Sequence, residues 1–322
     1  MNIMNLSEVM DRSLAVLKKY FKSFFIYSLA WYIFMIVAFV VVGIICGIAL
    51  VFAVKSSSVI FVGAIAAVFV IFAIIVSLVS NIGIIKITEQ DFNGENVYAG
   101  DAIKISFKKL FPAAGLIIVE LILSLPVIAV FGAACYIIYR VVKTAAITNN
   151  WYSITAIMII IAAIILILLF VFFVVAFISV FAFSFQSMVI ENAGIFKCIG
   201  KSLKLIKGNF WRIFGSVILF LIVMYTLNMA IGALIGIITG AAYAVMNFLS
   251  IKQDFVTFFT VAITYLRWPI SIISDMVISP MFTIMITVMY YNQRFKKEGY
   301  NLILKLDKIR ALQGEEETGG NL

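Results

Sequence analysis

The chain has 322 residues, of which 65% are hydrophobic and only 12% are charged, and its formal net charge is +9. Soluble domains contain about 45–50% apolar and about 25% charged residues, so this composition excludes an ordinary soluble domain. Charge-free runs such as Phe24–Val54 exceed the length that a helix needs to cross the hydrocarbon core, about 20 residues. These runs lack the alternation of a transmembrane β-barrel. We therefore predict an all-α, polytopic membrane protein.

Missing residue types narrow the chemistry that the chain could perform. The sequence contains no histidine, which removes Ser-His-Asp and Cys-His catalysis and histidine-bound zinc or haem. The three cysteines, Cys46, Cys135 and Cys198, form no CxxC pair, and no phosphate-binding glycine motif is present. We expect a protein that is not an enzyme, with no catalytic residues, no metal ligands and no cofactor.

Apolar runs separated by charges predict six spans, which form a six-helix transmembrane bundle. In chain order they are Phe24–Val54, Val59–Ile85, Ala113–Tyr139, Ser153–Ile190, Ile213–Val245 and Ile270–Tyr291. Pro126 and Pro280 are the expected kink sites. The apolar stretch at 255–266 is too short to span, so it is an interfacial or re-entrant piece, or else the start of one long helix broken near Pro269.

Basic residues are distributed unequally between the two sides of this topology. Nineteen of the 24 Lys and Arg residues lie before the first span, after the last, or in the connections that follow spans two and four. Cytoplasmic loops carry an excess of Lys and Arg, so both termini are predicted to be cytoplasmic, in a bacterial cytoplasmic membrane. We assign the positive charge to orientation and to contact with anionic membrane lipids, and expect no nucleic-acid partner.

A cationic amphipathic segment precedes each pair of spans. SLAVLKKYF begins at Ser13, SFKKLF at Ser106 and SLKLIKGNF at Ser202, at separations of 93 and 96 residues. We predict three pseudo-repeats, at residues 5–88, 98–190 and 194–292, each an interfacial helix followed by a pair of transmembrane helices. They form a single domain over residues 1–310, and the acidic tail at 311–322 is predicted to be disordered.

Two stretches carry a family resemblance. VIENAGIFKCIGKSLKLIKGNFWRIFG begins at Val189, and MYYNQRFKKEGYNLILKL begins at Met289. Together they resemble a bacterial membrane-domain family that is fused to some glycerophosphoryl diester phosphodiesterases, and related stand-alone polytopic membrane proteins. The positions that match the family pattern are Glu191, Ser202, Leu203, Lys207, Phe210, Trp211, Tyr290, Tyr291, Arg294, Glu298 and Gly299. The resemblance covers the membrane half only, so it implies a membrane fold and no hydrolase activity.

Ionisable residues inside predicted spans are candidate functional groups, because they are costly in hydrocarbon. Glu120 and Asp275 are the acids, at depths too different for one catalytic pair, and Lys86 and Arg267 are nearby cations. Lys86 is expected to reach towards Glu120 by snorkelling. Polar side chains at Asn81, Gln186 and Asn228 are expected to form interhelical hydrogen bonds.

The third amphipathic segment is the candidate lipid-binding helix. Its lysines, Lys197, Lys201, Lys204 and Lys207, could hold anionic headgroups at about 1 kcal/mol each. The expected apolar face opposite them contains Ile195, Ile199, Leu203 and Ile206. Glu191 is expected to cap this helix or to pair with its lysines.

The sequence favours a non-enzymatic scaffold or transport-accessory protein that contacts membrane lipids and a protein partner supplied in trans. One alternative is a transporter or permease for a lipid-like or amphipathic peptide substrate, with a separate ATPase partner because the chain has no P-loop. An immunity protein against a membrane-active peptide and an intramembrane enzyme acting on lipid are further alternatives. The oligomeric state stays open.

Overall fold

A computed structural model describes residues 4–55, 59–147, 154–249 and 254–299, and these residues form helices with no strand. The helices are α1 (Leu6–Lys19), α2 (Phe21–Lys55), α3 (Val59–Val79), α4 (Asn81–Asn93), α5 (Ala99–Lys108), α6 (Leu110–Ile147), α7 (Ile154–Phe181), α8 (Ser184–Ile190), α9 (Ile195–Ile206), α10 (Phe210–Phe248) and α11 (Phe255–Glu298). The all-α prediction is confirmed for this part of the chain. The acidic tail at 311–322 lies outside it.

Six helical stretches are long and apolar enough to cross a membrane. They are Phe21–Phe52, Ile60–Asn93, Leu110–Thr144, Ile157–Ile190, Phe210–Phe248 and Pro269–Glu298. Each corresponds to one predicted span, and all except Ile157–Ile190 extend beyond at least one end of that span. The shortest contains 30 residues and the longest 39, so they must tilt or project past the hydrocarbon core. These six helices fit a multi-pass integral membrane protein.

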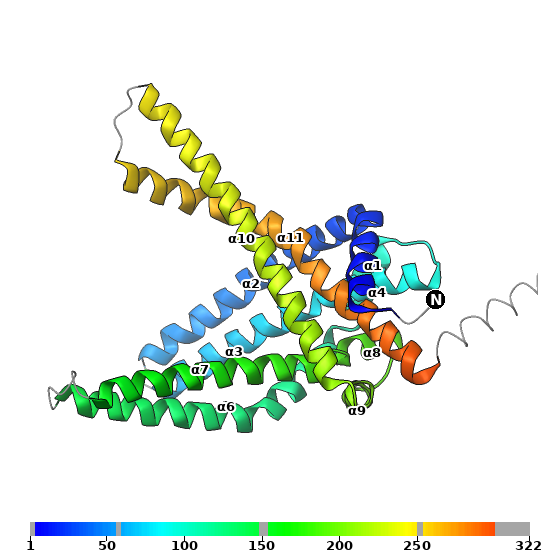
Figure 1. Cartoon of the computed structure of the whole chain (residues 1–322), viewed down its shortest axis with the longest axis horizontal. Helices are drawn as coiled ribbons and strands as arrows, with labels where there is room; N and C mark the ends of the chain where they lie inside the picture. The colour runs from blue at the N-terminus through cyan, green and yellow to red at the C-terminus, as the bar shows by residue number, and fades with distance from the viewer. Residues whose placement is uncertain (1–3, 56–58, 148–153, 250–253, 300–322) are drawn as a thin grey trace, which may run out of the picture.

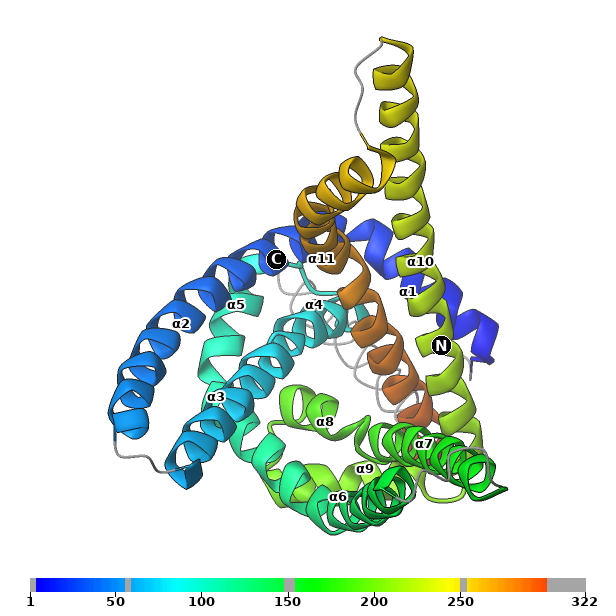
Figure 2. The ribbon, with the colours of Figure 1, turned by 90° about the vertical axis from the view of Figure 1, so that its left-hand side faces the viewer.

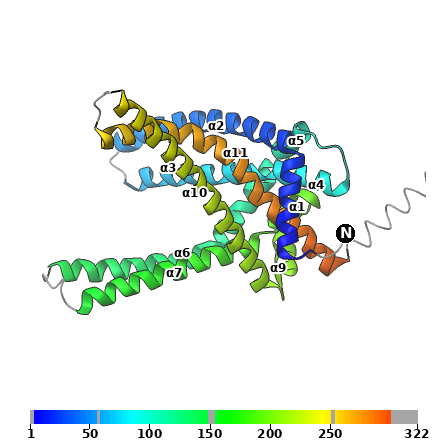
Figure 3. The same ribbon diagram turned by 45° about the horizontal axis from the view of Figure 1, so that its top comes forward.

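Three long hairpins diverge from one end of the molecule. They are α2 with α3, α6 with α7, and α10 with α11, whereas α1, α4, α5, α8 and α9 gather where the hairpins converge (Figure 1, Figure 3). The most hydrophobic stretches of α2 and α7 contain no buried residue. Surfaces this apolar require lipid around them, because water would oppose their exposure.

The short apolar stretch at 255–266 belongs to one long helix. α11 runs from Phe255 to Glu298 without interruption through Pro269 and Pro280, and it changes direction along its length (Figure 1). Asp254 caps its start, where the carboxylate accepts from the Thr257 N–H at 2.9 Å. The candidate span within this helix starts at Pro269, one residue before the predicted start at Ile270, whereas the helix itself starts at Phe255 and has no break near Pro269. Proline removes one backbone N–H and bends a helix without having to end it.

The ends of the second helix of each hairpin meet at the centre of the converging region. α4 contacts α8 and α11 there. The ring of Phe183, at the start of α8, lies 5.7 Å from the ring of Tyr290 on α11. The three amphipathic helices lie around this centre, with α5 on α4, α9 on α8 and α1 on α11 (Figure 2). α5 and α9 therefore pack on the end of the hairpin that precedes each of them in the chain, whereas α1 packs on the end of the last hairpin.

The second helix of two of the hairpins is interrupted, and hydroxyl groups form hydrogen bonds with the backbone at each interruption. Between α3 and α4, the Tyr27 hydroxyl donates to the Ser80 carbonyl at 2.7 Å and lies 2.9 Å from the Ser106 Oγ. Between α7 and α8, the Ser202 Oγ donates to the Val180 carbonyl and accepts from the Phe183 N–H. Backbone groups freed by a break need such partners away from water.

Candidate functional site

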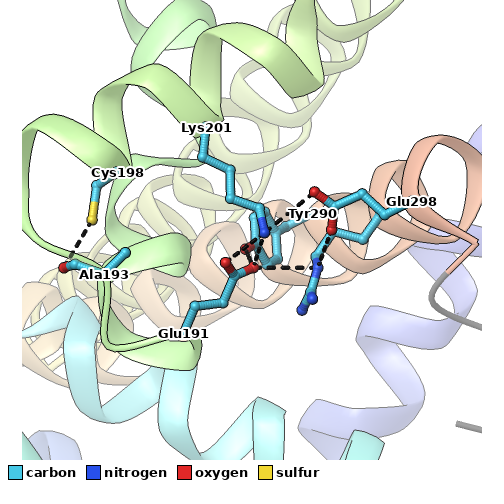
Figure 4. Close-up of polar contacts among 7 residues, drawn as sticks. Glu191, Ala193, Cys198, Lys201, Tyr290 and Glu298 are labelled. Carbon is cyan, nitrogen blue, oxygen red and sulfur yellow. Dashed lines mark hydrogen bonds and ion pairs between the residues drawn. The ribbon is translucent and has the colours of Figure 1, made fainter. Parts of the chain in front are cut away.

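Five polar side chains form a cluster, which we call the Glu191 cluster. They are Glu191, which follows α8, Lys201 of α9, and Tyr290, Arg294 and Glu298 towards the end of α11. Figure 4 labels all of them except Arg294. Glu191 accepts hydrogen bonds from the Lys201 ammonium and the Tyr290 hydroxyl. The Arg294 Nε lies 3.3 Å from the Glu191 Oε1 and 2.9 Å from the Glu298 Oε2. Lys201 also pairs with Glu298 at 3.3 Å.

The Glu191 cluster is electrically balanced and only partly exposed. Its two carboxylates alternate with two cations, and the charged side chains retain between 10% and 25% of their exposure. Each carboxylate already has cationic partners, so the arrangement neutralises charge and links three helices. Groups occupied in this way are suited to holding the helices together rather than to exchanging protons with a substrate.

The other positions of the family pattern have structural contacts at the same end. The Tyr291 ring stacks on Phe92 at 4.3 Å between ring centres. Gly299 ends α11 in the left-handed conformation, with φ of 61°, which suits a residue without a side chain. Lys207 accepts at its carbonyl from Lys297, and Trp211 is exposed at the start of α10.

A second cluster, the Asp91 cluster, was not anticipated from sequence. The Asp91 carboxylate is 2% exposed and pairs with Arg12 and with Lys19, the latter at 3.0 Å. The pKa of Lys19 is raised. The largest cause is a hydrogen bond with Tyr20, and the next is the neighbouring Asp91 carboxylate. The cluster joins α1 to the end of α4. Its only sequence signal was an acid near the end of a span, the same feature that drew attention to Glu191.

The structure changes the role of one predicted lipid-binding lysine. Lys201 pairs with Glu191 and Glu298, the other expectation for Glu191, whereas Lys197, Lys204 and Lys207 are exposed and keep their predicted role. Of the predicted apolar face, Ile199 and Ile206 are buried as expected, whereas Leu203 is 46% exposed and Ser202 is fully buried in its place. The reason is that α9 packs on α8 and α7 through Cys198, Ile199, Ser202, Leu205 and Ile206.

The intramembrane ionisable residues do not pair as expected. Lys86 bonds Glu89 at 3.1 Å, three residues along its own helix, so the expected reach towards Glu120 was wrong. Glu89 is one helical turn from Lys86, so it pairs with the Lys86 ammonium more readily than Glu120 on another helix does. Asp275 lies on the wall of a separate polar cavity of about 150 Å³, beside Tyr32 and Ser279. The Arg267 side chain lies outside the described side chains.

Glu120 lines a different cavity, of about 250 Å³, where α3, α4, α6, α7, α8 and α11 approach one another. Asn81 and Thr283 on its wall bond each other at 2.5 Å, which is an interhelical bond as expected for Asn81. The Glu120 Oε1 and the Gln186 Oε1 are buried and have no hydrogen-bond partner among the described residues. The expected partner for Gln186 is therefore missing, and Asn228 bonds the Met224 carbonyl of its own helix.

Cys198 gives a simple test of the packing beside the Glu191 cluster. Its side chain is fully buried, and its thiol lies 3.3 Å from the Ala193 carbonyl (Figure 4). Burial raises the pKa of the Cys198 thiol. Less thiolate forms at a given pH, so alkylation should be slow and should accelerate only at more alkaline pH.

We expect a variant whose only cysteine is Cys198 to react with maleimide at least about tenfold more slowly than a variant whose only cysteine replaces the exposed Lys104. The rate is measured by mass spectrometry of the intact protein in detergent. Equal rates would show that α9 does not pack as described.

Among the described residues, no group of three Cys, Asp or Glu side chains is arranged to hold a metal ion. No family model, curated protein or solved structure matches the chain. The class of protein therefore follows from the six apolar helices alone, and it is a multi-pass integral membrane protein.

Proposed function

We propose that the chain is a non-enzymatic scaffold or transport-accessory protein of the bacterial cytoplasmic membrane. The observation that supports this role is the Glu191 cluster, in which charged residues from α8, α9 and α11 bind one another. Charge concentrated at one end of the molecule is used to join helices, while three apolar hairpins extend away from it (Figure 1). This arrangement suits a rigid base that presents membrane helices to a partner.

We propose in addition that the chain consists of three related units, each an amphipathic helix and a hairpin. The aligned serines Ser13, Ser106 and Ser202 are all fully buried, and each donates to a backbone carbonyl. α3 and α7 end at breaks, and α11 carries Pro280 in its inner half. The resemblance to membrane domains fused to phosphodiesterases is part of this proposal, and a partner in trans would take the place of the fused enzyme.

The scaffold role predicts a stable complex in the native membrane. Purification after cross-linking is expected to yield a stoichiometric protein partner that is absent from a mock purification. Reconstituted alone in proteoliposomes, the protein is expected to move no solute. Translocation of an amphipathic peptide or lipid-like dye by the protein alone would contradict the scaffold role.

Contact with anionic lipid is assigned to the exposed face of α9 and the start of α10. Lys197, Lys204 and Lys207 lie there with Trp211, an aromatic residue suited to the membrane interface. Changing the three lysines together to Gln is expected to reduce retained anionic lipid in a salt-dependent way, because surface attraction is screened by salt. Unfolding should be unchanged within about 0.5 kcal/mol.

The control for this prediction is Lys201→Gln, which removes a paired lysine on the same helix. It should destabilise the protein and leave the retained lipid unchanged, as measured by mass spectrometry of extracted phospholipid. Equal lipid loss in both variants would argue against the assignment.

A transporter or permease, with a separate ATPase partner, is the second candidate function. It is favoured by Glu120, a carboxylate within a span that lines a cavity bounded by several helices. Identification of the cross-linked partner as an ATPase would support this candidate over the scaffold.

A further inference from the structure

The cavity beside Glu120 combines polar groups from four different spans. Asn81, Glu120, Gln186 and Thr283 lie in the stretches Ile60–Asn93, Leu110–Thr144, Ile157–Ile190 and Pro269–Glu298, respectively. Asn81 and Thr283 satisfy each other. The groups left for a ligand are therefore the Glu120 Oε1 and the Gln186 Oε1, and Gln186 is only 3% exposed.

The Glu120 carboxyl interacts with the Ser184 hydroxyl but has no cationic partner on the described wall of this cavity. No Lys or Arg is among its described lining residues, and Lys86 is paired with Glu89. A carboxylate in a membrane span is costly unless a cation or hydrogen-bond donor accompanies it. This contrasts with the Glu191 cluster, where each carboxylate has two cationic partners.

The rest of the wall is apolar and aromatic. It includes Phe177, Phe181, Phe185 and Phe282. Aromatic faces attract ammonium groups as well as alkyl chains, most strongly where water is excluded. A carboxylate, an amide oxygen and several phenyl rings are together the components of a site for an organic ammonium ion.

We propose that this cavity binds a net-cationic amphipathic amine, with its ammonium group at Glu120 and Gln186 and its alkyl chain against the phenylalanines. The site goes beyond the scaffold role and does not depend on it. The cavity has a volume of about 250 Å³. Pockets for drug-sized ligands start at about 300 Å³, so this cavity suits a small ammonium head group. A zwitterionic phospholipid fits poorly, because its phosphate would find no cation on the described wall.

The test uses the full-length protein in a neutral maltoside detergent, with octylammonium and octanol as matched probes. Octylammonium is expected to raise the unfolding temperature in a saturable way, whereas octanol is not. Glu120→Gln should weaken this binding about tenfold or more, because it removes a charge-assisted hydrogen bond. The control Asp275→Asn, in the neighbouring cavity, should bind like the wild type.

Two further arms complete the experiment. Gln186→Leu removes the second acceptor and should also weaken binding, which keeps the test decisive should Glu120→Gln fail to fold. Phosphatidylethanolamine, which carries an amine and a phosphate, should give no stabilisation and so separates a free amine from a lipid headgroup. Equal shifts with octylammonium and octanol, or equal loss of binding in Glu120→Gln and Asp275→Asn, would overturn the proposal.

Discussion

Replacing Glu191 by Gln is expected to destabilise the protein by about 3 kcal/mol, because it removes one member of a paired, largely buried ion cluster. Lys201 and Arg294 would then share the single carboxylate of Glu298, and the Tyr290 hydroxyl would lose its charged acceptor. The value lies at the low end for buried pairs, since the Glu191 side chain retains 22% exposure. Denaturation in mixed micelles, followed by intrinsic fluorescence, measures the change.

Two controls separate the Glu191 cluster from a general effect of losing charge. Glu95→Gln changes an exposed acid and should stay within about 0.5 kcal/mol of the wild type. Tyr290→Phe removes one hydrogen bond and should cost about 1 to 2 kcal/mol. If Glu191→Gln were as mild as Glu95→Gln, the cluster would not hold α8, α9 and α11 together.

Gly83→Ala is expected to be the most damaging single-methyl change among the described glycines. A Cβ at this position would lie 2.2 Å from two ring atoms of Tyr27, a side chain that is only 1% exposed and is held by hydrogen bonds. Overpacking of this kind costs about 1–3 kcal/mol, and displacement of Tyr27 would also break its bonds to Ser80 and Ser106. We expect a loss of about 3 kcal/mol or more, measured in the same mixed-micelle assay.

The matched control is Gly63→Ala, in the same candidate span, where an added Cβ meets nothing within 4 Å. It should be neutral or slightly stabilising, because alanine favours a helix over glycine. In a Gly83→Ala background, Tyr27→Leu should recover part of the loss by vacating the space of the ring. Absence of any recovery would mean that the Tyr27 contact is not the cause.

The spans could be predicted from the sequence because membrane solvation depends on local composition. Runs of about 20 apolar residues need no tertiary information to be identified. The α1 and α9 segments were similarly visible as amphipathic helices. The pattern did not predict that Leu203 is exposed and Ser202 is buried. Hydrophobic periodicity cannot distinguish a helix face that packs on protein from one that contacts lipid.

The candidate site was predictable only in its local contacts. Glu191 and Lys201 are ten residues apart, and pairing with a lysine of α9 was one of the two alternatives expected for Glu191. Arg294 and Glu298 join them from about 100 residues further along. Such contacts depend on how hairpins assemble, which composition does not encode. The expected contact between Lys86 and Glu120 was wrong because of a local effect. Glu89, a nearer acid on the same helix, pairs with Lys86 instead.

We propose that α4, α8 and the end of α11 lie together with the three amphipathic helices α1, α5 and α9 on the cytoplasmic side of a membrane. Single cysteines at the exposed positions Asp11, Lys104, Lys197 and Lys296, in a background without Cys46, Cys135 and Cys198, test it directly. A membrane-impermeant maleimide should label all four in inside-out vesicles and none in intact cells. Labelling of any one of them from outside intact cells would contradict the arrangement.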